Sequence, residues 1–244
     1  LLESIDHLRR DVDASGSLES ADRYQAQAFE TITRGAADAF DWTQEDAKTI
    51  ARYATRQLFD QKKLQKYHDM KRASNLLGLQ MLTARRRCER GCGFVTVSDA
   101  GWDYHANNNS PKRMAGIWPM GGQVDHAVSA FIEDVEALGL SEKILLVCCG
   151  EMGRTPRVNK KAGRDHWGGS APLMLYGGGL KMGQVIGQSD KTASAPAADL
   201  VTNNMLLGTV MHTLFDIPNL RLRNNLPAEV QRVITNAAPI KQLV

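Results

Sequence analysis

The second half of the chain alternates between short β-branched runs and one long amphipathic segment, and this alternation limits the possible folds more than any other feature. The runs are GFVTVSDAG at 93–101 and KILLVCCG at 143–150. Between them, residues 124–140 place apolar side chains at helical spacing. A strand, a helix and a second strand in this order predict a right-handed parallel crossover.

Two further segments extend this pattern. APLMLYGGG at 171–179 predicts a third strand, and the segment 199–218 predicts a later helix that ends at Pro218. We therefore expect residues 91–244 to form an α/β unit with a mostly parallel sheet flanked by helices.

The first 90 residues contain no convincing strand and predict a helical layer packed on the same domain. Leu1, Ile5 and Leu8, and then the stretch 24–40, recur at helical spacing. A helix start is predicted after Thr43, leading into a long helical stretch up to about residue 67. A further helix is expected over 74–89, closed by Gly91.

Composition excludes several classes of partner. The chain has 244 residues and a net charge of +3 without a long basic block, so we expect neither nucleic acid nor an anionic membrane as a partner. No apolar run is long enough to predict a membrane span. The four cysteines do not predict a zinc framework, because Cys88 and Cys92 lack a second ligand pair; Cys148 and Cys149 are interpreted as small buried residues.

Polar clusters follow the predicted strands, where ligands bind in open parallel sheets. The first is GWDYH, in which Asp103 and His105 are two residues apart and project to one side of an extended segment. They are either a metal-ligand pair or a turn acid beside an exposed loop histidine. In the second cluster, GEMGRTP, Arg154 either pairs with Glu151 or binds a tetrahedral anion, and the ion pair is the safer interpretation.

The third cluster, GRDHWGG, contributes Arg164, Asp165 and His166. Taken together, the clusters offer two histidines and three carboxylates, which is a ligand set expected for Zn²⁺, Mn²⁺ or a two-metal hydrolase. The predicted metal ligands are Asp103, His105, Glu151 and His166, and the predicted catalytic residues are Arg154, Arg164 and Asp165. The remaining histidines are interpreted as structural or surface residues; they are His7, His68, His126 and His212.

The run of GWDYH, GEMGRTP and GRDHW in this order resembles a bacterial family of sulfatase-like proteins called domain of unknown function 1501, and on these motifs the chain is identified as a member of it. That family is similar to the alkaline phosphatase and sulfatase superfamily. The resemblance implies an alkaline phosphatase-like α/β fold in which Asp103, His105 and His166 match metal ligands. Glu151 stands where an Asp-His pair is usual, which leaves one metal site short of a ligand.

The resemblance also implies a function. We expect a metal-dependent hydrolase of phosphate or sulfate esters that uses Zn, Mn or Ca and acts on a small anionic ester; the alternative is a non-catalytic binding or assembly protein that keeps the hydrolase fold. In the superfamily a first strand supplies a metal-binding Asp and the nucleophile. We expect a segment before Leu1 to supply both as an intramolecular partner, and the chain alone to show little turnover. Family members often carry an export signal, which implies a periplasmic location.

Overall fold

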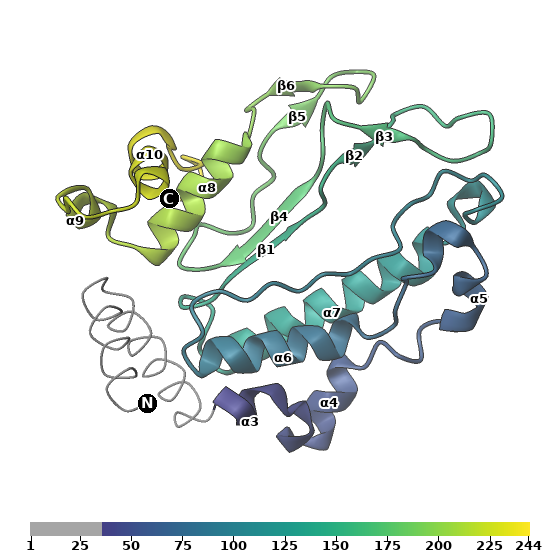
Figure 1. The fold of residues 1–244 in the computed structure, drawn as a ribbon, viewed down its shortest axis with the longest axis horizontal. Coiled ribbons are helices and arrows are strands. Elements are labelled where there is room, and N and C mark those ends of the chain that lie inside the picture. Colours follow the sequence, from purple (N-terminus) through teal and green to yellow (C-terminus); the bar gives the residue numbers. More distant parts are fainter. Residues whose placement is uncertain (1–35) are drawn as a thin grey trace, which may run out of the picture.

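The computed structural model describes residues 36–244, and these begin with a helical region that ends at Glu89 (Figure 1). The helices of this region, α for α-helices and η for 3-10 helices, are α3 (Ala36–Phe40), η1 (Trp42–Gln44), α4 (Ala47–Tyr53), α5 (Gln61–Gln65), η2 (His68–Met70) and α6 (Leu77–Glu89). The helical pattern predicted at Leu1, Ile5, Leu8 and over most of 24–40 lies outside the described residues.

The long helix predicted after Thr43 is interrupted. Its start is close to the expected place, because the Asp46 side chain accepts hydrogen bonds from the backbone N–H groups of Lys48 and Thr49 at 2.9 and 3.0 Å and so caps α4. The helix ends at Tyr53, and the chain becomes helical again only in α5.

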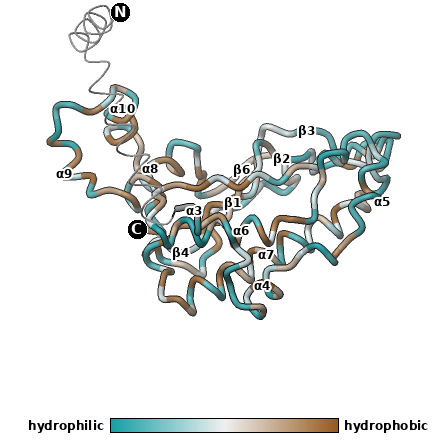
Figure 2. The backbone as a smooth tube through the Cα atoms, turned by 60° about the horizontal axis from the view of Figure 1, so that its bottom comes forward, coloured by the Kyte–Doolittle hydropathy of each residue, from teal (hydrophilic) through white to brown (hydrophobic). Residues whose placement is uncertain are grey.

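The main core lies between α6 and α7 (Ile117–Ala137), which run side by side in Figure 1. In Figure 2 stretches of α7 are coloured hydrophobic, as the apolar spacing of the sequence requires. The buried residues of this core are Tyr53, Leu77, Met81, Leu82, Ala127, Ala130, Phe131, Val135 and Ile144. The predicted helices over 74–89 and 124–140 are therefore present, with α7 beginning earlier than expected.

The predicted parallel sheet is wrong. The described part of the chain contains three two-stranded sheets, and all are antiparallel. β1 (Leu145–Cys149) pairs with β4 (Leu173–Gly177), β2 (Gly153–Arg154) with β3 (His166–Trp167), and β5 (Gln188–Ser189) with β6 (Pro196–Ala198). The alkaline phosphatase-like α/β architecture expected for residues 91–244 is therefore not observed.

Two physical reasons explain this correction. A parallel pair needs a crossover connection, usually a helix, but the residues between β1 and β4 form the β2–β3 hairpin and bring the chain back antiparallel (Figure 1). In addition, the segment 93–97 is extended but pairs with no strand among the described residues.

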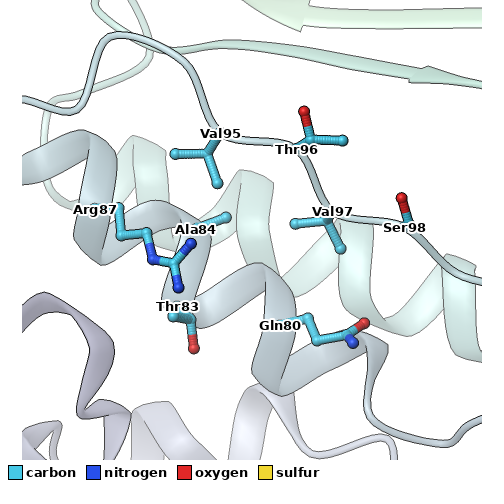
Figure 3. A pocket seen from close by; sticks show the side chains of 8 residues that line it. All are labelled: Gln80, Thr83, Ala84, Arg87, Val95, Thr96, Val97 and Ser98. Atoms are coloured by element: carbon cyan, nitrogen blue, oxygen red, sulfur yellow. The ribbon is translucent and has the colours of Figure 1, made fainter.

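The unpaired segment lies against α6. In Figure 3 the side chains of Val95 and Val97 point toward the helix, whereas those of Thr96 and Ser98 point away from it. The sequence alternation thus produced the side-chain pattern of a strand without its hydrogen bonds.

The chain ends in a second helical group, in which α10 (Ala228–Asn236) packs against α8 (Asn203–Leu214) and α9 (Ile217–Arg221). The helix predicted over 199–218 ends at Leu214, and Pro218 lies in the first turn of α9, where proline is well tolerated. Among residues 36–244, no helix combines the length and apolar character that crossing a membrane requires.

Candidate metal centre

In the segment 102–105, the aromatic side chains lie on one side and the polar side chains on the other. Tyr104 is 2% exposed and belongs to a second buried cluster, and its hydroxyl donates to the Gly116 carbonyl at 3.1 Å. The Trp102 ring packs edge-on against the Tyr104 ring, with 6.3 Å between centroids. Because neighbouring side chains of an extended segment alternate, burial of this aromatic pair places Asp103 and His105 on the opposite side.

The β2–β3 hairpin brings two further groups to the same place. Arg154 and His166 are directly paired across the hairpin. The hairpin needs glycine at position 153, because a Cβ atom there would lie 1.8 Å from the Ser170 carbonyl oxygen. The loop that joins β2 to β3 is mainly hydrophilic in Figure 2.

Three ligand atoms form a small triangle. The Nε2 atoms of His105 and His166 are 3.2 Å apart, and the Asp103 Oδ1 atom lies 3.2 Å from the first and 3.0 Å from the second. The side chains of His105, Asp103 and His166 are 25%, 44% and 47% exposed, so an ion and an external ligand have access. Ligand atoms at 2.0–2.1 Å from a tetrahedral Zn²⁺ are separated by roughly 3.3 Å. Each edge of the triangle is close to this separation.

Asp165 orients His105. Its Oδ1 atom lies 3.1 Å from His105 Nδ1, and because an ionised carboxylate only accepts hydrogen bonds, Nδ1 carries the proton. A neutral His105 then presents the lone pair of Nε2 toward the triangle. A carboxylate behind a ligating histidine is the usual support of metal-bound imidazole.

Asn159 is a residue of this centre that the sequence patterns did not reveal. Its Nδ2 atom donates to Asp165 Oδ1 at 3.0 Å and to the His105 carbonyl at 3.3 Å. The only sequence signal is an asparagine four residues before Gly163, a spacing that suits a tight polar loop. Gly163 lies so close that a Cβ atom there would be 2.5 Å from the His105 carbonyl oxygen.

Arg154 places a positive charge beside the triangle. Its Nη2 atom donates to Asp103 Oδ1 at 2.7 Å and to the Trp102 carbonyl at 3.0 Å, and its Nη1 atom lies 3.5 Å from His105 Nε2. The positive charge of Arg154 therefore opposes a cation at the triangle and attracts an anion near it. The expected Glu151–Arg154 ion pair is not found; Arg154 pairs with Asp103.

The carboxyl groups of the centre are stabilised in their ionised form. Partial burial by itself would raise the pKa of Asp103, but hydrogen bonds from His166 and Arg154 and the charge of Arg154 outweigh it and lower the pKa to about 2. Hydrogen bonds from His105 and Asn159 also lower the pKa of Asp165. Both groups are thus negatively charged at neutral pH.

Two residues predicted for the site lie apart from the triangle. Glu151 is exposed and is not a member of the group formed by Asp103, His105 and His166. The Arg164 guanidinium donates to the backbone carbonyls of Thr155 and Pro156, which ties the loop to β2. The metal-binding and catalytic roles of all seven predicted residues stay predictions.

A separate hollow of about 220 Å³ lies between α6 and the unpaired segment and contains none of the predicted site residues (Figure 3). It is lined by Gln80, Thr83, Ala84, Arg87, Val95, Thr96, Val97 and Ser98.

The fold and the site together define a mostly helical protein with short antiparallel hairpins and an exposed centre of two histidines, two aspartates and an arginine. Residues 1–240 match the family described as "Protein of unknown function (DUF1501)", and the chain belongs to this family. No curated protein and no solved structure is significantly similar to the chain.

Proposed function

We propose that the protein is a metal-dependent hydrolase of phosphate or sulfate esters, with its metal centre formed by Asp103, His105 and His166. The observation that carries the proposal is the triangle of ligand atoms with edges of 3.0–3.2 Å. Asp165 fixes the proton of His105 on Nδ1, so His105 Nε2 and Asp103 Oδ1 are both acceptors. Without a cation, the Nε2–H group of His166 is the donor between them; a cation that replaces this proton would be bound by three lone pairs. Three acceptors facing one another repel unless a proton or a cation lies between them.

The donor set suits Zn²⁺ or Mn²⁺ better than Ca²⁺, because two imidazoles and one carboxylate oxygen are too few oxygen ligands for calcium. A divalent ion bound there would supply Lewis-acid polarisation of the ester. Arg154 is positioned to bind the anionic group and to stabilise its developing charge, and Asp165 and Asn159 hold His105 in place. The role proposed for Arg164 is to hold the loop that carries Asp165 and His166.

One observation favours the alternative, a protein that holds an ion without turnover. Within residues 36–244, no hydroxyl or thiol group hydrogen-bonds to a side chain of the triangle, whereas a nucleophile activated by one of these histidines would make such a bond.

Zinc and manganese binding, measured by calorimetry, tests the centre, and hydrolysis of aryl phosphate and aryl sulfate tests the reaction. We expect one ion per chain, and loss of binding in His105→Ala and in His166→Ala. His212→Ala, at an exposed position of α8, and Glu151→Gln are the controls and should bind as the unchanged protein does. Failure of the unchanged protein to bind an ion rejects the centre, whereas ion binding without hydrolysis by the full-length gene product supports the alternative.

A further inference from the structure

A hollow of about 320 Å³ opens beside His105. It is lined by His105, Asn107, Asn159, Lys160, Lys161 and Asp165. Three of these residues belong to the candidate metal centre or support it directly, namely His105, Asn159 and Asp165, so a molecule held at the centre would extend into this hollow.

The two lysines are carried by a loop that is tied to the centre. Asn159 Oδ1 accepts from the backbone N–H groups of Lys161 and Gly163 at 2.9 and 3.1 Å, and the Asn159 N–H donates to the Gly163 carbonyl at 2.7 Å. The same Asn159 binds the His105 carbonyl and Asp165 through its Nδ2 atom. The position of the lysine pair relative to His105 is therefore fixed by the fold.

The hollow carries an excess of positive charge. Lys160 and Lys161 are exposed, and neither has a salt-bridge partner among residues 36–244. The one carboxylate of the lining, Asp165, already accepts hydrogen bonds from His105 and Asn159. The charge of Lys161 acts on Asp165, but the two ammonium groups outnumber this one carboxylate of the lining, and an excess of positive charge around a concave opening attracts anions.

We propose that Lys160 and Lys161 form a subsite for a second anionic group of the substrate, so that the preferred ester carries a carboxylate, phosphate or sulfate in addition to the group bound at the metal centre. This inference rests on the proposed function, which assigns the first anionic group to the centre. A pair of exposed lysines by itself would be part of an ordinary solvated surface. This pair differs because it lines a hollow that His105 also lines.

Calorimetric binding of two probes to the full chain, with and without Zn²⁺, tests the subsite. The probes are phenyl phosphate and 4-carboxyphenyl phosphate, which differ by one carboxylate. We expect the unchanged protein to bind the second probe about fivefold more tightly, since each exposed charge pair adds a modest amount. The preference should fall as salt is added.

The double variant Lys160→Gln/Lys161→Gln should bind both probes equally, and Lys160→Arg/Lys161→Arg should keep the preference. The matched control is Lys48→Gln/Lys241→Gln, which removes the same two charges at exposed positions on α4 and near the C-terminus. Equal binding of the two probes by the unchanged protein, or no binding of either, overturns the subsite, as does a preference that survives in the Lys160→Gln/Lys161→Gln variant. A preference for 4-carboxyphenyl phosphate without hydrolysis of either probe by the full-length gene product leaves the subsite standing and rejects the hydrolase.

Discussion

Arg154 is the residue whose position bears most directly on how the centre holds an ion. Its guanidinium contacts Asp103 and lies beside His105 Nε2, so it opposes a cation at the triangle while favouring an anion near it. We predict that Arg154→Gln binds Zn²⁺ about tenfold more tightly, since a like charge a few ångströms away is removed. The same variant should bind phenyl phosphate more weakly.

Calorimetric titrations of zinc and of phenyl phosphate measure the two effects separately. Arg157→Gln is the control, because it removes the same charge from an exposed position three residues further along the chain. Weaker zinc binding by Arg154→Gln would show that the arginine mainly holds Asp103 in place and would contradict the prediction.

Asp99 is a second residue with a measurable consequence. Burial raises its pKa, against the opposing hydrogen bond from the Trp102 indole, and its Oδ1 atom has no partner in the described part of the chain. A carboxyl group whose pKa is raised on folding contributes stability that is full below its ordinary pKa and is lost as the pH rises through the raised value.

We therefore predict that Asp99→Asn, which does not titrate, gains stability relative to the unchanged protein as the pH rises above the ordinary carboxyl pKa of about 4. Urea unfolding over this range measures the difference in unfolding free energy. Asp125→Asn, on the exposed side of α7, corrects for the loss of one negative charge. A difference that stays constant or falls as the pH rises would refute the assignment of Asp99 as a destabilising buried charge.

At the scale of elements, the packing of α6 on α4 and α7 includes a buried ionic network centred on Arg85. Its guanidinium is 3% exposed and contacts Glu45 at 3.0 Å, Glu89 at 2.6 Å and Asp134 at 2.9 Å. The Tyr53 hydroxyl donates to the same Asp134 carboxylate at 3.0 Å. The network connects the helical region before residue 90 to α7, so removing its centre affects three helices at once.

Arg85→Met should lower the free energy of unfolding by about 3–5 kcal/mol, because Asp134 is left buried without its countercharge. Chemical denaturation measures this loss. Arg90→Met, at an exposed position just after the same helix, should change stability by less than about 0.5 kcal/mol. A loss of that small size for Arg85→Met would mean that the network is solvated.

At the scale of the whole molecule, the extended segment 93–98 has the alternating side-chain pattern of a strand but no strand partner in the described part of the chain. Its backbone N–H groups have no hydrogen-bond acceptor among residues 36–244, whereas those of β1 can pair with β4. Amide hydrogen exchange should therefore be at least about 100-fold faster in 93–98 than in the middle of β1. Equal protection of both segments, measured by mass spectrometry, would show that the segment is a paired strand.

Much of the local structure follows from the sequence. The apolar spacing of 124–140 and the run KILLVCC predicted α7 and β1, since the period of burial is a local property. The alternation in GWDYH predicted that Asp103 and His105 share a side, and the packing of buried Tyr104 and partly buried Trp102 in one cluster produces that arrangement. The order of the three polar motifs also identified the family.

Only the tertiary structure decided which segments pair and which polar groups meet. Strand direction depends on the connection, and the β2–β3 hairpin turns β4 antiparallel to β1 where the sequence pattern predicted a parallel sheet. The same hairpin places Arg154 opposite His166 and leaves Glu151 outside the triangle. The physical reason is that burial periodicity is encoded residue by residue, whereas pairing and side-chain convergence depend on contacts between residues far apart in the chain, which no local pattern specifies.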